Sequence, residues 1–185
     1  MQILGLSDST PHTESRLKSL FWPSIKTAND VEYLGRQGYW VCTVIAAYFF
    51  DVLIWGRPFY AIFCLAFYYL GGVGIRQRSS YAASLVLVMQ FADTFLNGIH
   101  VVRVLILALL LSNLRATWIA SRWNADSEEA ALPPRLRETW TDVFTDQLPV
   151  WLWKKVELSY YVFSTGLLVL DFAAFLLRGR AAFRG

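Results

Sequence analysis

Five ionisable residues lie within the long apolar stretches that fill most of this 185-residue sequence. They are Asp51, Asp93, His100, Arg103 and Asp171. A charged side chain is costly inside a lipid bilayer, so such residues pair with one another or mark proton relays, ion paths and cofactor sites. This set therefore allows three kinds of chemistry: a structural ion pair, a proton or cation relay, and axial ligation of a pigment or haem.

The order of these residues along the chain favours the structural ion pair. Asp93 and Arg103 flank one short turn, so a salt bridge between them would hold two consecutive helices together. A relay would instead require one carboxylate of the set to titrate without a fixed counter-charge. His100 is the only histidine in an apolar stretch, so it could be a single axial ligand of a pigment or haem shared with a partner. The sequence predicts no other cofactor and no metal site, and it predicts bound lipids.

The composition is that of an integral membrane protein. Hydrophobic residues make up 56% of the chain and charged residues 17%, and the mean hydropathy is +0.39. A soluble domain of this size needs more charge on its surface. Aromatic residues reach 16%, with eight tryptophans, and Trp and Tyr gather where hydrocarbon meets headgroups. Both cysteines, Cys42 and Cys64, lie in apolar stretches and are predicted to be buried thiols outside any disulfide.

The apolar stretches predict an all-α fold. Stretches at 38–56, 58–75, 79–98 and 99–118 are long enough to cross a bilayer, and the short turns between them make consecutive spans antiparallel. We expect an antiparallel four-helix transmembrane bundle, an amphipathic interfacial helix and a fifth transmembrane helix. The predicted segments are a polar N-terminal tail with an interfacial anchor (1–28), the four-helix bundle (29–118), a polar loop with the amphipathic helix (119–157), the fifth transmembrane helix (158–177) and a basic C-terminal tail (178–185).

Apolar residues at helical spacing after a Pro-Pro break predict the amphipathic helix. Leu136, Trp140, Val143, Phe144 and Leu148 fall on one helical face. Such a helix lies on a membrane surface or on a partner. Four tryptophans are predicted to anchor the chain at the membrane interface: Trp22, Trp140, Trp151 and Trp153.

The distribution of basic residues predicts a cytoplasmic N-terminus. In this orientation 12 of the 17 Lys and Arg residues lie on the cytoplasmic side, 4 lie on the other side, and Arg103 lies within a span. The same orientation brings the five ionisable residues to the outer third of the bilayer. The basic tail after 158–177 would face outward, so this stretch either spans against the rule, lies flat, re-enters the membrane or packs against a partner.

Several short motifs resemble those of small, uncharacterised bacterial multi-span inner-membrane proteins. The motifs are Phe21-Trp22-Pro23-Ser24, the segment from Gly74-Ile75 through Arg78-Ser79-Ser80 to Ala82-Ala83, and Leu114-Arg115-Ala116-Thr117. The resemblance covers residues 21–123 and implies a four-span core in a bacterial inner membrane. It implies no activity and no site residues.

The functional prediction depends on the absence of catalytic motifs. The sequence contains no Walker loop, no His-Glu-x-x-His, no Gly-x-Ser-x-Gly and no Cys-x-x-Cys. We therefore expect a non-catalytic accessory or scaffold subunit of a larger membrane complex, with respiratory and photosynthetic complexes as candidates. Its partners would be other membrane subunits and lipids, not nucleic acid. The alternative is a small oligomeric proton or cation channel or transporter that uses the buried aspartates. The predicted location is a bacterial inner membrane, with the mitochondrial inner membrane as the alternative.

Overall fold

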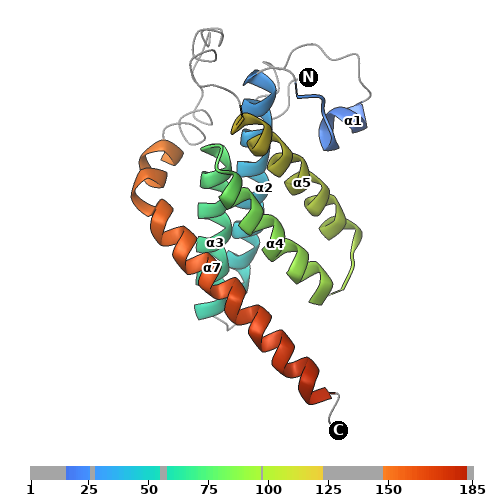
Figure 1. Cartoon of the computed structure of the whole chain (residues 1–185), viewed down its shortest axis with the longest axis vertical. Helices are drawn as coiled ribbons and strands as arrows, with labels where there is room; N and C mark the ends of the chain where they lie inside the picture. The colour runs from blue at the N-terminus through green and yellow to red at the C-terminus, as the bar shows by residue number, and fades with distance from the viewer. Residues whose placement is uncertain (1–15, 26–27, 55–57, 97, 123–147, 183–185) are drawn as a thin grey trace.

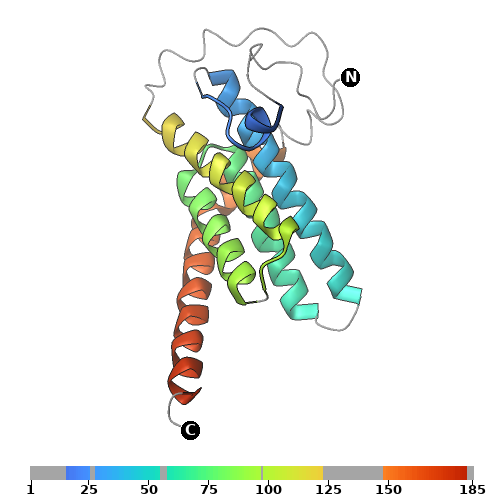
Figure 2. The same ribbon diagram turned by 90° about the vertical axis from the view of Figure 1, so that its right-hand side faces the viewer.

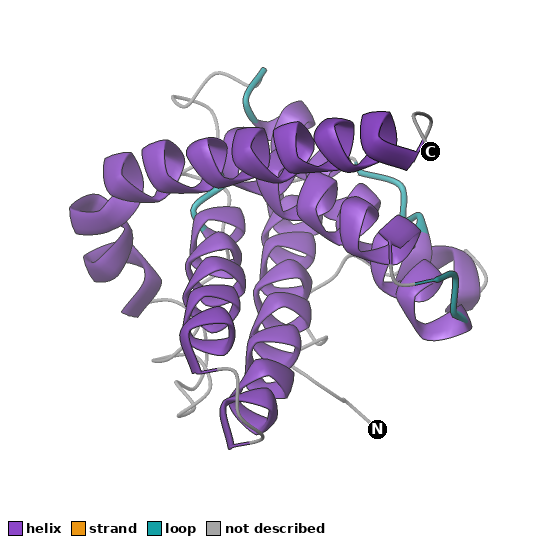
Figure 3. Ribbon diagram, turned by 90° about the horizontal axis from the view of Figure 1, so that it is seen from below, coloured by secondary structure: helices purple, strands orange, loops and turns teal. Residues whose placement is uncertain are grey.

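A computed structural model describes residues 16–25, 28–54, 58–96, 98–122 and 148–182. Within these ranges the chain is all-helical, as predicted, and contains no strand (Figure 3). The helices are α1 (Arg16–Phe21), α2 (Ala28–Ile54), α3 (Pro58–Arg76), α4 (Ser80–Leu96), α5 (Val101–Ala120) and α7 (Leu148–Ala182). The predicted amphipathic helix falls mostly on residues outside the described ranges, and so does the first part of the N-terminal tail.

The long helices run alternately up and down along one axis (Figure 1). The pair α2 and α3 makes the most extensive contact, and α5 packs against both α2 and α4. Helix α7 lies along α3 and α4 in its first half and then leaves them (Figures 1 and 2). The short helix α1 lies against α5.

The turn between α3 and α4 shows how local sequence sets the helix ends. Arg78 has a φ of 59°, a left-handed conformation that ends a helix. The Ser79 amide donates to the Gly74 carbonyl at 3.0 Å, which closes the last turn of α3. The Ser79 hydroxyl then accepts a hydrogen bond from the Ala82 amide at 3.1 Å, so Ser79 caps the start of α4. This turn makes α3 and α4 antiparallel neighbours.

Glycines of α3 allow its neighbours to approach closely. A Cβ added to Gly72 would lie 2.7 Å from Cβ of Cys42 on α2. A Cβ added to Gly74 would lie 2.5 Å from Cβ of Ala82 on α4 and 2.5 Å from Cη2 of Trp153 on α7. Such distances are far inside ordinary carbon–carbon contact. The end of α3 therefore packs by backbone approach, a role of small residues in membrane helices.

Trp153 lies in the core and not at the surface where the sequence analysis placed it. Its side chain is 5% exposed and packs against Gly74, Tyr160 and Tyr161, with ring centroids 5.7 Å away in both pairs. Because Gly74 has no side chain, the indole of Trp153 can lie directly against the α3 backbone. This contact forms only where α3 and α7 pack side by side. Helix α7 also runs without a break across the predicted boundary between 157 and 158.

Two of the described helices are long and apolar enough to cross a membrane, namely α3 and α5. Both coincide with predicted spans. Large apolar side chains are exposed on all the long helices, including Phe59, Phe91 and Leu158. An apolar exterior of this extent is typical of a surface covered by lipid or by another protein.

Candidate functional site

The first group of charged residues lies where α4 ends and α5 begins. The Arg103 guanidinium Nη1 lies 3.5 Å from the Asp93 carboxylate Oδ2 and donates to the Asp93 backbone carbonyl at 3.0 Å. Both side chains are about one quarter exposed, 27% for Asp93 and 28% for Arg103. The pair connects α4 to the loop and first turn of α5. It can clamp the two helices, and partial exposure limits its contribution to stability.

A buried hydrogen bond continues this polar group into the core. The Tyr68 hydroxyl of α3 donates to the Gln90 side-chain oxygen of α4 at 3.1 Å, and both side chains are buried. Gln90 precedes Asp93 by three residues, so the two residues lie on one side of α4. The sequence analysis did not identify this bond, because Tyr68 and Gln90 are 22 residues apart and only the packing of α3 on α4 brings them together.

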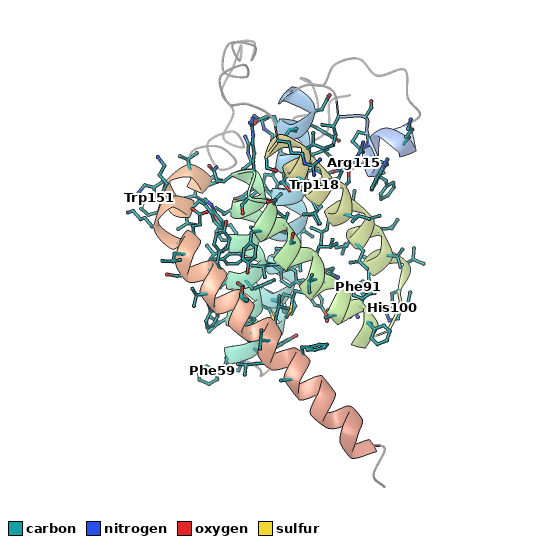
Figure 4. All side chains as sticks on the ribbon, in the orientation of Figure 1. Phe59, Phe91, His100, Arg115, Trp118 and Trp151 are labelled. Carbon is teal, nitrogen blue, oxygen red and sulfur yellow. The ribbon has the colours of Figure 1, made fainter. Side chains whose placement is uncertain are left out.

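The other predicted residues of this group are His100, Asp51 and Asp171, and the structure describes the side chain of His100 alone among them. His100 is exposed, immediately before α5, close to Phe91 and on the side of the molecule away from Arg115 and Trp118 (Figure 4). Asp51 belongs to the last turn of α2, which ends on this side (Figure 1). Asp171 belongs to the second half of α7. The side chains of Asp51 and Asp171 lie outside the described residues, so a shared charge cluster remains a prediction.

A second charged group lies at the opposite end, between the start of α2 and the end of α3. The Arg76 guanidinium donates to the Glu32 carboxylate at 2.6 Å, and Arg36 Nε lies 3.5 Å from the same carboxylate oxygen. Arg76 is only 8% exposed. The Glu32 carboxylate thus pairs with Arg36 of its own helix and with Arg76 of α3, and so joins α2 to α3. Half-burial of the neighbouring Tyr33 raises the pKa of its phenol, which stays neutral.

The sequence analysis counted Arg36 and Arg76 among the 12 cytoplasmic basic residues and did not group them with Glu32 as a site. Glu32 and Arg36 have the i, i+4 spacing of a helical ion pair, which is a local signal in the sequence. Arg76 is 44 residues away from Glu32, so the contact between them depends on the antiparallel packing of α2 and α3.

The same end of the molecule carries Trp22 and Trp151, two of the tryptophans that the sequence predicts as interfacial anchors. Trp22 lies under the Arg115 guanidinium, 4.9 Å from ring centroid to Cζ, and Arg115 donates to the Pro23 carbonyl at 3.0 Å. Trp151 is exposed and lies 4.2 Å from the Lys155 ammonium. Trp140 lies outside the described residues. The Arg115 contacts fix the segment before α2 against α5, whereas the contact between Trp151 and Lys155 lies within α7.

The geometry of both groups is that of helix clamps. The charged side chains bind each other across helix pairs. Among the residues that the structure describes, no group of three or more His, Cys, Asp or Glu side chains is placed to hold a metal ion. No protein family, curated protein or solved structure matches the chain. The arrangement of the helices and their charges therefore carries the functional argument.

Proposed function

We propose that the chain is a non-catalytic accessory or scaffold subunit of a larger membrane complex. In this proposal α2, α3, α4 and α5 form an antiparallel four-helix transmembrane bundle with the N-terminus in the cytoplasm, and α7 is a fifth membrane helix. The apolar exterior and the two helices long enough to span a membrane support the embedding. The preferred membrane is a bacterial inner membrane, following the charge distribution and the resemblance of residues 21–123, with the mitochondrial inner membrane as the alternative.

The observation that carries the proposal is the second half of α7. Leu168 is the last described residue of α7 that packs against the core. After it the helix projects past the ends of α3 and α4 (Figures 1 and 2), and Val169, Leu170 and Phe172 are more than 60% exposed. Among the described residues of this part of α7, none belongs to the core cluster of its own chain or packs against it. A neighbouring subunit packed along this part of α7 would cover these exposed apolar residues.

The charge clamps fit a passive role. Glu32 with Arg76, and Asp93 with Arg103, each join two helices near one end. Clamped ends keep the helices at fixed positions, which a scaffold requires. In this proposal the mechanism is shape-matching, lipid filling at subunit boundaries, and a constant surface for neighbours.

Purification from the native membrane in mild detergent tests this proposal. We expect a particle much larger than the 21.2 kDa chain, with partners in fixed stoichiometry, and an absorption spectrum would reveal any pigment held with His100. Leu170→Ala with Phe172→Ala should release the partners without lowering the melting temperature of the isolated chain. Leu158→Ala with Val162→Ala is the matched control. These residues are at least as exposed, but they lie on the half of α7 that packs along α3 and α4.

A small proton or cation channel is the second candidate. It is favoured by the polar line that begins at the Tyr68–Gln90 hydrogen bond inside the core and reaches Asp93 at the end of α4. A channel would purify without partners and conduct after reconstitution into liposomes, and Asp93→Asn would abolish the flux while the fold persisted. A particle that contains only this chain, together with such a flux, would replace the scaffold proposal.

A further inference from the structure

We propose that the end of the molecule where α5 finishes and α7 begins binds the anionic headgroups of phospholipids. This inference rests on the membrane embedding proposed above and adds which lipid the chain selects. It follows from three pairs of a tryptophan and a cation, which share this end and are drawn from the segment before α2, the end of α5 and the start of α7.

Each pair places a positive charge over an indole ring. The pairs are Trp22 with Arg115 at 4.9 Å, Trp118 with Arg122 at 3.8 Å, and Trp151 with Lys155 at 4.2 Å. Such cation–π contacts hold the charge at the depth of the ring. An indole settles at the headgroup level of a bilayer because its body is apolar and its N–H binds water or lipid oxygen. The contacts therefore fix three cations at headgroup depth.

The rings face outward from the helices. Trp22, Trp118 and Trp151 are 45%, 52% and 57% exposed. Arg115, Trp118 and Trp151 all lie toward one end of the molecule, and His100 and Phe59 lie toward the other (Figure 4). We call these three pairs the tryptophan–cation belt.

The charge of this end fits an anionic lipid. Arg122, Lys154 and Lys155 are exposed there. The described carboxylates of this end are Asp30, Glu32 and Glu157; Asp30 is buried, and Glu32 binds Arg76. Among the described residues of this end, Glu157 is thus the one exposed carboxylate beside the exposed Arg122, Lys154 and Lys155, so positive charge dominates their surface. A guanidinium or ammonium over a ring keeps N–H donors for a phosphate oxygen. The predicted orientation puts this end in the cytoplasmic leaflet, whose surface is negative in many membranes.

Electron paramagnetic resonance of spin-labelled lipids tests the inference in bilayers that contain the full-length chain. We expect labelled phosphatidylglycerol to be immobilised at the protein surface in preference to labelled phosphatidylcholine. Arg122→Gln with Lys155→Gln should reduce this preference by about fivefold for each cation removed. The matched control is Arg178→Gln with Arg180→Gln, which removes the same charge near the opposite end of α7 and should leave the preference unchanged. Helical circular dichroism would show that both variants fold.

The possible results separate this inference from the proposal on which it rests. Equal immobilisation of both lipids would overturn the belt while leaving the chain in the membrane. A loss of preference of the same size in both variants would also overturn it, because the effect would come from net charge alone. Immobilisation of neither lipid would contradict the membrane embedding itself. A preference that disappears in the belt variant, and that high salt weakens, would support the belt as an electrostatic site.

Discussion

Replacement of Gly74 by alanine would test whether α3, α4 and α7 pack as the structure shows. The added Cβ would lie 2.5 Å from Cβ of Ala82 and 2.5 Å from Cη2 of Trp153. Carbon atoms in contact lie about 3.5–4.0 Å apart, so the neighbours must move by roughly 1 Å. Cβ of Ala82 is fixed to the α4 backbone and the indole is buried, so neither can move without disturbing the core.

The expected cost can be estimated from two opposing effects. Overpacking of a core destabilises by about 1–3 kcal/mol, and two close contacts at one atom place this case near the upper value. Alanine is favoured over glycine inside a helix by about 1 kcal/mol. We therefore expect Gly74→Ala to lower the free energy of unfolding by about 2 kcal/mol. In a chain of this length this corresponds to a fall of about 4–8 °C in melting temperature.

Gly166 provides the matched control within the same molecule. It lies in α7, and a Cβ added there meets nothing within 4 Å. Gly166→Ala should therefore raise the melting temperature slightly or leave it unchanged. The assay is thermal unfolding followed by circular dichroism in detergent. Adding Ala82→Gly to Gly74→Ala removes one of the two contacts and should restore part of the loss. If Gly74→Ala melted as high as Gly166→Ala, the close packing of α3 described here would be wrong.

Three further predictions use the same purified chain. Arg76→Gln should destabilise the fold by about 2–3 kcal/mol, because it leaves a partly buried carboxylate without its closest cation. Arg103→Gln should cost less than about 1 kcal/mol, because that pair is more exposed. If thermal melting showed Arg103→Gln to be the more destabilising of the two, this reasoning would be wrong. Cys42 and Cys64 are buried, so a maleimide should label them only after denaturation, and rapid labelling of the folded chain would refute their placement. Tyr68→Phe removes a buried hydrogen bond and should cost about 1 kcal/mol, a loss that denaturant titration can measure; an unchanged midpoint would show that the bond contributes no stability.

The sequence was sufficient to predict the helices and the interactions between residues that are close along the chain. Long apolar stretches can satisfy their backbone groups in a bilayer only as helices or closed barrels, and their spacing favoured helices. Asp93 and Arg103 flank one turn, so their pairing required only that the two adjacent helices fold back on each other. The pairing of Glu32 with Arg36 follows from helical spacing in the same way.

Interactions between distant segments required the tertiary structure. Trp151 and Trp153 stand two residues apart in one segment of apolar and basic residues, and both were predicted to be interfacial anchors. The structure exposes Trp151 and buries Trp153, because only Trp153 meets the space left by Gly74 on α3. The sequence does not reveal this space, since a glycine creates room only where another helix covers it.

The same distinction separates the two charged groups. Glu32 and Arg36 could be paired by helical spacing, but the third member, Arg76, is 44 residues away from Glu32. The hydrogen bond between Tyr68 and Gln90 and the course of α7 away from its own core are also invisible along the chain. A sequence determines which segments become helices because backbone hydrogen bonding and hydrophobic periodicity are local. Which faces those helices bury depends on how side chains of different helices fit together, and only the packed structure decides that.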